Sequence, residues 1–354
     1  MKGKNPFCIT FGRPPVQLVS RITEKQHIID MFTMSPITDQ IFLITGVRGS
    51  GKTVLMGEIS NELEQTGEWI VLRENTSYDI NKSIYSDLYK ALHKHHISLQ
   101  MVSVNSPIGG ITFESEGGEE SLSEQIDTLL QIAEKHHKKV LVTIDEVYNC
   151  ENIRKFSKIF QTALTRKRSI FFLGTGLFEN IDALINEKDM TFLHRAPRIE
   201  LTPLNSTAMA ASYQSVFQIP LRKALELAAL TKGYSFAFQA LGYIFWERDC
   251  PDDISTIMSD YDALLSNSSY NVIWRECSKK DQEILEAMAG IDSSDVSAIR
   301  KACGDMSSRY FSVYRQRLIR KGILTSDARS TLTFALPRFR EYIQHEIMMR
   351  DFSD

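Results

Sequence analysis

A glycine-rich stretch that ends in a lysine and a threonine is the part of this sequence best suited to chemistry. Residues 46–53 read GVRGSGKT and fit the pattern G-x-x-x-x-G-K-[ST]. The glycines let the backbone wrap closely around an anion, so that successive N–H groups and the start of a following helix point at phosphate oxygens. The stretch therefore predicts a phosphate-binding loop.

The residues of this loop have different expected tasks. Lys52 would neutralise phosphate charge, and Thr53 would place its hydroxyl on Mg²⁺. The side chain of Arg48 has no predicted role and is expected to point to solvent, so that only its backbone would contribute to the loop. The expected phosphate contacts are Gly46, Val47, Arg48, Gly49, Ser50, Gly51, Lys52, Thr53 and Val54.

Two acids follow a second apolar run, at residues 140–144. They are Asp145 and Glu146, and ligands of open parallel sheets bind at this carboxyl end of the strands. Asp145 is the expected outer-sphere Mg²⁺ partner alongside Thr53, and Glu146 would orient and deprotonate an attacking water. The alternative is a solvated turn without a role.

Two further candidates accompany the next strands. Residues 169–173 lead into Gly174-Thr175-Gly176, where Thr175 is expected to touch a terminal phosphate or the water. Arg195 precedes a short strand at residues 198–201 and would face outward, toward the site of a neighbouring copy. The alternative for Arg195 is a surface or intradomain ion pair.

The elements that must position these residues follow from the pattern of apolar segments. Strand patterns that alternate with helical ones predict an α/β domain with a parallel sheet and helices on both faces. Residues 205–265 carry helical patterns only and predict an all-α lid, and the polar run 266–269 predicts a linker. The expected strands are 41–45, 69–73, 140–144, 169–173 and 198–201, and the expected helices include 24–34, 221–230 and 236–248.

The C-terminal segment has a different pattern, with three helices and then a hairpin. Helices are expected at 279–289, 295–303 and 308–321, and strands at 323–325 and 331–334, the order of a winged helix-turn-helix. Residues 306–326 hold several cations and no acid, which suits contacts with duplex DNA. The alternative is a protein-binding module with a solvated basic face. The expected DNA contacts are Arg309, Arg315, Arg317, Lys321 and, at the hairpin tip, Arg329.

The bulk properties fit an ordinary globular protein of several domains. The chain has 354 residues and a net charge of −3, so that any nucleic-acid surface must be local. The five scattered cysteines predict reduced thiols. No apolar run approaches the length of a membrane span, and we expect a cytoplasmic protein. The expected domains are 1–204, 205–270 and 271–354.

With these motifs the chain resembles the AAA+ ATPases, most of all the replication-initiator clade and the related archaeal-type and STAND-like ATPases. The resemblance implies ATP and Mg²⁺ as cofactors, a five-stranded sheet in the order 5-1-4-3-2, and Thr175 as sensor 1. It also implies that Arg195 is an arginine finger that acts in trans within a homo-oligomer. Residues 14–21 resemble the N-terminal box that packs near the adenine, with Pro15 and Val16 as the contacts.

One departure from the initiator pattern concerns the lid. Residues 231–239 contain no arginine where initiator-type members carry sensor 2. The stretch is more similar to the Gly-x-Pro segment of STAND-like ATPases, with Ser235 in place of the proline. Lys232 is a candidate substitute for the missing arginine.

Two functions are therefore predicted. The first is a Mg²⁺-dependent ATPase that binds ATP and ADP and whose nucleotide state controls assembly and DNA binding through the winged helix. The alternative is a STAND-like switch in which nucleotide exchange controls a protein partner with little turnover. Replication, transposition, transcription and defence all use this architecture, and the sequence does not choose among them.

Overall fold

The computed structural model describes residues 3–10, 15–95, 97, 118–326, 328 and 330–351. The chain divides into two compact units. We call Ile22–Thr45 with Lys52–Glu200 the sheet unit, and Met1–Arg21 with Gly46–Gly51 and Leu201–Asp354 the helical unit. The three expected domains are a different division of the chain and stay a prediction.

The sheet unit is an α/β structure around five parallel strands in the order β2-β3-β4-β1-β5. Read from the other edge, this is the predicted order 5-1-4-3-2, which is thereby confirmed. Its elements are α1 (Ile22–Thr33), β1 (Ile41–Thr45), α2 (Lys52–Gln65), β2 (Trp69–Glu74), α3 (Ile80–Lys94), α4 (Gly118–Lys135), β3 (Lys139–Ile144), α5 (Glu151–Thr165), β4 (Ile170–Gly176), α6 (Phe178–Ile185), the 3-10 helix η1 (Lys188–Arg195) and β5 (Arg198–Glu200).

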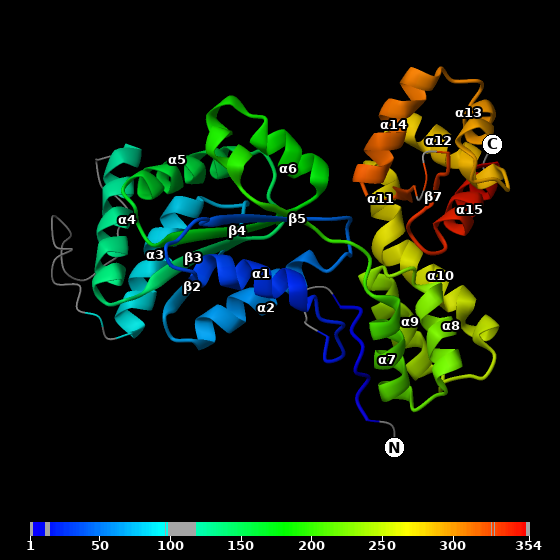
Figure 1. Ribbon diagram of the computed structural model, residues 1–354, viewed down its shortest axis with the longest axis horizontal. Helices are drawn as coiled ribbons and strands as arrows, with labels where there is room; N and C mark the ends of the chain where they lie inside the picture. Colours follow the sequence, from blue (N-terminus) through cyan, green and yellow to red (C-terminus); the bar gives the residue numbers. More distant parts are fainter. Residues whose placement is uncertain are drawn as a thin grey trace. The chain divides into compact units, whose positions relative to one another are not determined.

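Helices cover both faces of this sheet, with α1 and α2 on one face and α5 and α6 on the other (Figure 1). Successive residues of a strand point to opposite faces, and β4 shows this with two neighbouring phenylalanines. The ring of Phe171 lies 5.2 Å from that of Phe32 in α1, whereas Phe172 lies 5.2 Å from Phe156 in α5. Burial on both faces explains why the strands read as continuous apolar runs.

The strand β4 is longer than the sequence predicts. It continues through Gly174-Thr175-Gly176, so that Thr175 pairs with Ile44 of β1 inside the sheet instead of lying in a loop after it. All seven residues of β4 are buried. Thr175 is therefore held by the strand ladder at the carboxyl edge of the sheet.

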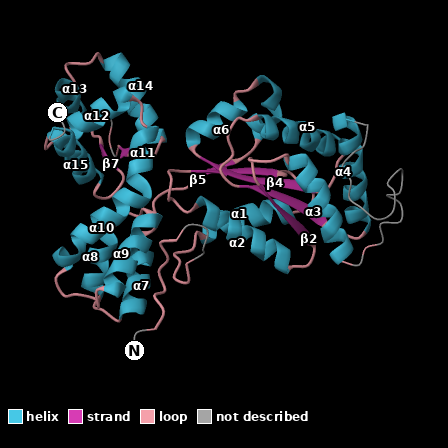
Figure 2. Cartoon of the chain, turned by 180° about the vertical axis from the view of Figure 1, so that it is seen from behind, coloured by secondary structure: helices cyan, strands magenta, loops and turns pink. Residues whose placement is uncertain are grey.

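The helical unit consists of helices and two short strands (Figure 2). Helices α7 to α10 follow the predicted all-α pattern of residues 205–265, and three helices followed by an antiparallel pair of strands follow the predicted C-terminal order. Its elements are α7 (Ser206–Phe217), α8 (Leu221–Leu230), α9 (Ser235–Glu247), the 3-10 helix η2 (Ile254–Ile257), α10 (Met258–Leu265), the π-helix η3 (Ser266–Tyr270), α11 (Asn271–Glu276), α12 (Lys279–Gly290), α13 (Val296–Ala302), α14 (Ser308–Arg320), β6 (Leu324–Thr325), β7 (Thr333–Phe334) and α15 (Phe339–Asp351).

The predicted linker at residues 266–269 is wrong. The chain continues through a π-helical turn from α10 into α11. The hydroxyl of Ser266 donates to the carbonyl oxygen of Asp262 at 2.7 Å, and Tyr270 is fully buried with its ring 4.9 Å from that of Phe339. Packing of Tyr270 outweighs the weak helix propensity of the serines and asparagine.

Candidate functional site

The predicted phosphate loop is divided between the two units. Residues Gly46–Gly51 belong to the helical unit, whereas Lys52 and Thr53 begin α2 in the sheet unit. The buried strand β1 precedes the loop and the helix α2 follows it, which is the order that this motif requires. Lys52 is only 8% exposed, and Thr53 is exposed.

Asp145 is the centre of a hydrogen-bonded set at the carboxyl edge of the sheet. The hydroxyl of Thr53 donates to its Oδ2 at 2.8 Å, and the hydroxyl of Thr175 donates to its Oδ1. Thr53 lies 92 residues before Asp145 in the chain, and the fold brings the two side chains together. These are the two residues that we expected from the sequence to share Mg²⁺. Thr175 is completely buried and orients the Asp145 carboxylate.

Glu146 follows Asp145 in a left-handed backbone conformation, with φ at +53°. Its N–H lies 3.1 Å from Oδ1 of Asp145 and 3.2 Å from Oγ1 of Thr175. The side chain is exposed, whereas the next residue, Val147, is fully buried. The turn therefore directs the Glu146 carboxylate outward from the strand end, where it can meet a water.

The oxygen donors of this set fit a magnesium ion. Mg²⁺ prefers carboxylate and hydroxyl oxygens, and adjacent ligands of an octahedral ion at about 2.1 Å lie about 3.0 Å apart. Oγ1 of Thr53 and Oδ2 of Asp145 are 2.8 Å apart. The two oxygens can therefore stand in one coordination shell or in consecutive shells of the same ion.

A third acid, Glu74, lies at the same sheet edge and was not expected from the sequence. It ends β2, pairs in register with Ile144, and is 6% exposed. Burial raises the pKa of Glu74, and hydrogen bonds from Ser83 and Tyr78 oppose that shift. The signal in the sequence was a single acid at the end of an apolar strand, which is too common to single out.

Arg48 has a partner, contrary to the expectation that its side chain points to solvent. Nη2 of Arg48 lies 3.2 Å from Oε1 of Glu276, the last residue of α11, and the Arg48 side chain is 34% exposed. The two residues are 228 positions apart. This ion pair joins the predicted phosphate loop to the end of α11.

The segment that resembles the N-terminal box contacts helices α7 and α9. Gln17 accepts from the Gln239 amide of α9 and donates to the hydroxyl of Ser212 in α7. Pro15 is half-buried, and Val16 is 82% exposed. The expected contacts of Pro15 and Val16 with a base stay a prediction.

Arg195 ends η1 and its side chain is exposed. A second arginine, Arg198, begins β5 three residues later. Its Nη1 lies 3.9 Å from Oδ1 of Asp182 in α6. An exposed Arg195 is compatible with either expectation, a contact with a second copy or a surface position. Its role in trans stays a prediction.

The five predicted DNA contacts differ in their surroundings. Arg309 is exposed in the first turn of α14. Arg315 donates to the hydroxyl of Ser326 at 2.7 Å, next to the short hairpin. Arg329 lies outside the described residues.

The other two cations of that set, Arg317 in α14 and Lys321 directly after it, bind an acid of α12. Both lie near Oδ2 of Asp281, at 3.3 and 3.5 Å, and Asp281 is completely buried at the start of α12. Nζ of Lys321 also donates to the carbonyl oxygen of Glu276 at 3.2 Å. A buried acid must be paired, so that these two side chains serve the module's own stability.

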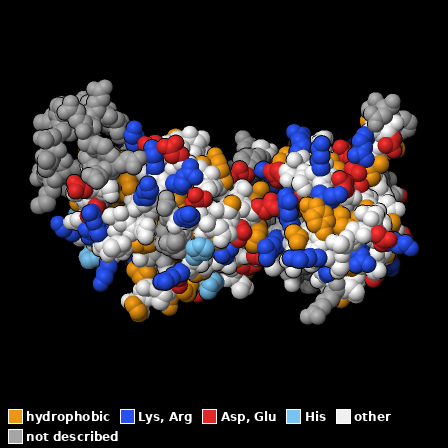
Figure 3. All heavy atoms as spheres, turned by 90° about the horizontal axis from the view of Figure 1, so that it is seen from above, with side chains coloured by type: hydrophobic (Ala, Val, Ile, Leu, Met, Phe, Trp, Pro, Cys, Tyr) orange, Lys and Arg blue, Asp and Glu red, His pale blue; other side chains and the backbone are white. Residues whose placement is uncertain are grey.

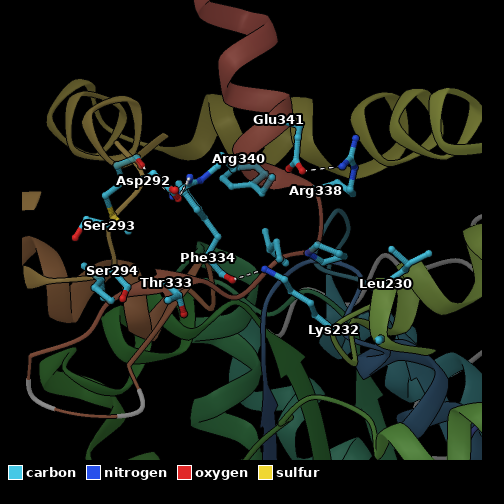
Figure 4. Close-up of a pocket in the computed structure, with 16 residues that line it drawn as sticks. Leu230, Lys232, Asp292, Ser293, Ser294, Thr333, Phe334, Arg338, Arg340 and Glu341 are labelled. Atoms are coloured by element: carbon cyan, nitrogen blue, oxygen red, sulfur yellow. Dashed lines mark hydrogen bonds and ion pairs between the residues drawn. The ribbon is translucent and has the colours of Figure 1, made fainter. Parts of the chain in front are cut away.

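Lys232, the candidate substitute for sensor 2, is engaged with the hairpin. Figure 4 shows its side chain beside a pocket of about 620 Å³, with Nζ 3.0 Å from the carbonyl oxygen of Phe334. Burial lowers the pKa of Lys232. The same pocket holds two ion pairs, Arg338 with Glu341 and Arg340 with Asp292.

Basic and acidic side chains are interspersed on the face of the molecule that Figure 3 shows. This mixture agrees with the small net charge of the whole sequence. Among the described residues, no helix combines the length and the apolar character that crossing a membrane would need.

Two family models match parts of the chain. The family described as nephrocystin 3, N-terminal matches residues 20–175, and a domain of unknown function (DUF8462) matches residues 267–343. No curated protein is significantly similar in sequence.

Solved structures resemble the chain over nearly its full length. A Walker-type ATPase of Pyrococcus abyssi matches with a TM-score of 0.67 at 14% identity, over 95% of this chain and 100% of that chain. The ORC2 protein of Aeropyrum pernix, solved as ADPNP-ADP complexes, matches with a TM-score of 0.59 at 12% identity, over 97% of each chain. The chain therefore shares its fold with this Walker-type ATPase and this ORC2 protein, and its sheet has the strand order that the AAA+ resemblance implied.

Proposed function

We propose that this chain is a Mg²⁺-dependent ATPase whose nucleotide state controls a DNA-binding C-terminal module. The observation that carries the proposal is the hydrogen-bonded set of Thr53, Asp145 and Thr175 at the carboxyl edge of the sheet. Its Thr53 directly follows the glycine loop with its lysine. The fold shared with a Walker-type ATPase and with an ORC2 protein in ADPNP-ADP complexes supports the same function.

Each residue of the site has a task that follows from its geometry. The N–H groups of the loop and the ammonium of Lys52 would hold the phosphates. Thr53 and Asp145 would hold Mg²⁺, which supplies a Lewis acid that offsets phosphate charge. The exposed carboxylate of Glu146 would accept the proton of an attacking water, and Thr175 keeps the Asp145 carboxylate in place.

An assembled state would add a further residue to the reaction. Arg195 is exposed at the end of η1, where a second copy of the chain can meet it. A guanidinium supplied in trans would stabilise the charge that develops on the transferred phosphoryl group. We therefore include a homo-oligomer with Arg195 as an arginine finger in the proposal.

The DNA-binding part of the proposal rests on α14. This helix is the third of three that precede the antiparallel pair β6 and β7, the position of a recognition helix in a winged helix-turn-helix. Arg309 is exposed near its N-terminus, the end of such a helix that contacts DNA. Arg315, Arg317 and Lys321 would act mainly by holding α14 in place, because each already contacts another part of the module.

The second candidate function is a nucleotide switch that acts on a protein partner. The observation that favours it is the apolar surface of α14 beside Arg309. Tyr310 is 47% exposed and Val313 is 61% exposed, and exposed aromatic and aliphatic side chains suit a protein interface. The lid without a sensor-2 arginine points the same way.

Phosphate release from ATP tests the proposed activity. We expect the purified chain to release phosphate with Mg²⁺, and the rate to fall to background with EDTA, because Thr53 and Asp145 would then lack the ion that links them to phosphate. The assay is run at several protein concentrations, since a contribution from Arg195 in trans makes the rate per molecule rise with concentration. A chain that binds neither ATP nor ADP would refute the proposal.

A further inference from the structure

Three consecutive carbonyl groups of the phosphate loop are hydrogen-bonded by three consecutive residues at the start of α9. The acceptors are the carbonyl oxygens of residues 48–50. The hydroxyl of Tyr234 donates to the first at 2.7 Å, the N–H of Phe236 to the second at 3.0 Å, and the hydroxyl of Ser235 to the third at 2.8 Å. We call residues 234–236 the clasp. Loop and clasp both belong to the helical unit.

Tyr234 is the most enclosed member of the clasp. It is 5% exposed, and its Oη lies 2.6 Å from the hydroxyl of Ser269 as well as 2.7 Å from the carbonyl oxygen of Arg48. Burial raises the pKa of Tyr234, so that the group stays a neutral hydroxyl donor at ordinary pH. A hydroxyl with two partners at these distances has a fixed position.

The loop fits closely against this hydroxyl. A Cβ added to Gly49 would lie 2.3 Å from Oη of Tyr234, and Gly49 has a φ of +76°. Glycine at this position is therefore needed both for the backbone conformation and for the approach of Tyr234. Arg21, which is 9% exposed, adds a further donor at 3.3 Å to the carbonyl oxygen of Ser50.

The clasp determines where the loop's N–H groups point. In a trans peptide the C=O and the following N–H point in opposite directions. Holding the carbonyls of residues 48 and 50 on the clasp side turns the N–H groups of Gly49 and Gly51 to the other side of the loop. The N–H of Ser50 is bonded within the loop to the carbonyl oxygen of Val47 at 3.1 Å.

We propose that Tyr234 is a positioning residue for nucleotide binding, and that the clasp orients the loop's N–H groups toward the phosphates from behind. This inference rests on the proposed function, because it takes the loop to bind a nucleoside di- or triphosphate. The lid then senses the nucleotide through the loop backbone. No arginine on the γ-phosphate is needed for this, in agreement with its absence from residues 231–239.

The coupling between nucleotide binding at the loop and the hydrogen bonds of the clasp is reciprocal. A nucleotide that favours this orientation of the loop peptides must stabilise the clasp by the same free energy with which the clasp favours the nucleotide. Lys232 lies two residues before Tyr234, in the turn that leads into α9, and it contacts the hairpin carbonyl of Phe334 (Figure 4). The clasp is thus bonded to the loop directly and to the C-terminal hairpin through a residue two positions away.

The test compares Tyr234→Phe with Tyr213→Phe by calorimetric titration of the full chain with ADP and Mg²⁺. Tyr213 is a matched control, since it is also fully buried and its hydroxyl donates to the Phe238 carbonyl at 2.7 Å, away from the loop. Each variant loses a buried hydrogen bond, so that both should lower the melting temperature. We expect only Tyr234→Phe to weaken ADP binding, by about tenfold.

A second pair of variants keeps the test decisive if Tyr234→Phe does not fold. Ser235→Ala removes one clasp contact from a half-buried position and should weaken ADP binding about threefold. Ser266→Ala, also half-buried with a hydroxyl bonded to a main-chain carbonyl, should not.

The outcomes separate the two proposals. If ADP binds equally to the wild-type chain and to Tyr234→Phe, or equally to Ser235→Ala and Ser266→Ala, the clasp does not position the loop and this inference is wrong. If the wild-type chain binds neither ADP nor ATP, the proposed function itself fails. Weaker binding in the clasp variants with unchanged binding in both controls supports the inference, since a purely structural role would lower only the melting temperature.

Discussion

The Lys52→Ala variant is expected to lose ATP binding, which is the largest effect on nucleotide affinity that the structure predicts for any single substitution. Lys52 begins α2 and is 8% exposed, so that its ammonium would meet phosphate in a largely desolvated place. Truncating one partner of a buried charge pair costs about 2–5 kcal/mol, which corresponds to a dissociation constant raised by roughly 30-fold or more. Calorimetric titration with ATP and Mg²⁺ measures this directly.

A second lysine of the sheet unit provides the control. Lys25 in α1 pairs with Glu62 at 2.8 Å, and its side chain is 20% exposed. Lys25→Ala also removes one partly buried positive charge, but it should leave the affinity for ATP unchanged. Equal affinities of the wild-type chain and Lys52→Ala would show that phosphates are not held by this loop.

The Glu146→Gln variant is expected to bind ATP with unchanged affinity and to lose hydrolysis. The side chain is exposed at the strand end, and glutamine keeps its shape but cannot accept the proton of water. Loss of a positioned general base lowers a rate by about 10²–10⁴-fold. Single-turnover hydrolysis of labelled ATP gives the rate, and the same samples give the affinity.

Glu151→Gln is the control for this variant. Glu151 lies five positions further along in the first turn of α5, and its exposed carboxylate pairs with Lys155 at 3.1 Å. Its loss should leave both hydrolysis and binding as they are. Normal turnover by Glu146→Gln would mean that another group, such as the buried Glu74 at the same sheet edge, accepts the proton.

Much of the sheet unit could be predicted from the sequence, because its signals are local. Strands buried on both faces produce continuous apolar runs, and β1 was predicted at its observed bounds. The strand order came from the family resemblance. The helix α15 was missed, because its buried residues Phe339, Tyr342 and Ile343 lie in its first half and its last turn carries exposed Met348 and Met349.

Only those site residues that belong to a recognisable sequence motif could be predicted. The glycine loop and the acid pair after β3 indicated that Thr53 and Asp145 would meet. The partners of Arg48, Arg317 and Lys321 had no such signal, because an ion pair between residues far apart in the sequence leaves no periodic pattern. Tyr234 was missed for a similar reason, since a tyrosine before an apolar helix looks like an ordinary core residue.

The central claim is that nucleotide state controls the C-terminal module, and a DNA titration tests it most directly. The Glu146→Gln chain, which would hold ATP without consuming it, is titrated onto labelled duplex DNA at low salt, once with ATP and Mg²⁺ and once with ADP and Mg²⁺. Arg309→Ala should weaken DNA binding. It should also lower the slope of the logarithm of the binding constant against the logarithm of the salt concentration by about one. Arg222→Ala, which removes a 93% exposed cation from α8, should change neither.

We predict dissociation constants that differ at least about fivefold between the two nucleotides, the lower end of ordinary allosteric coupling. Equal dissociation constants would contradict control by the nucleotide. A chain that binds both nucleotides but no duplex DNA at low salt would contradict the DNA-binding role and leave the switch on a protein partner as the function to pursue.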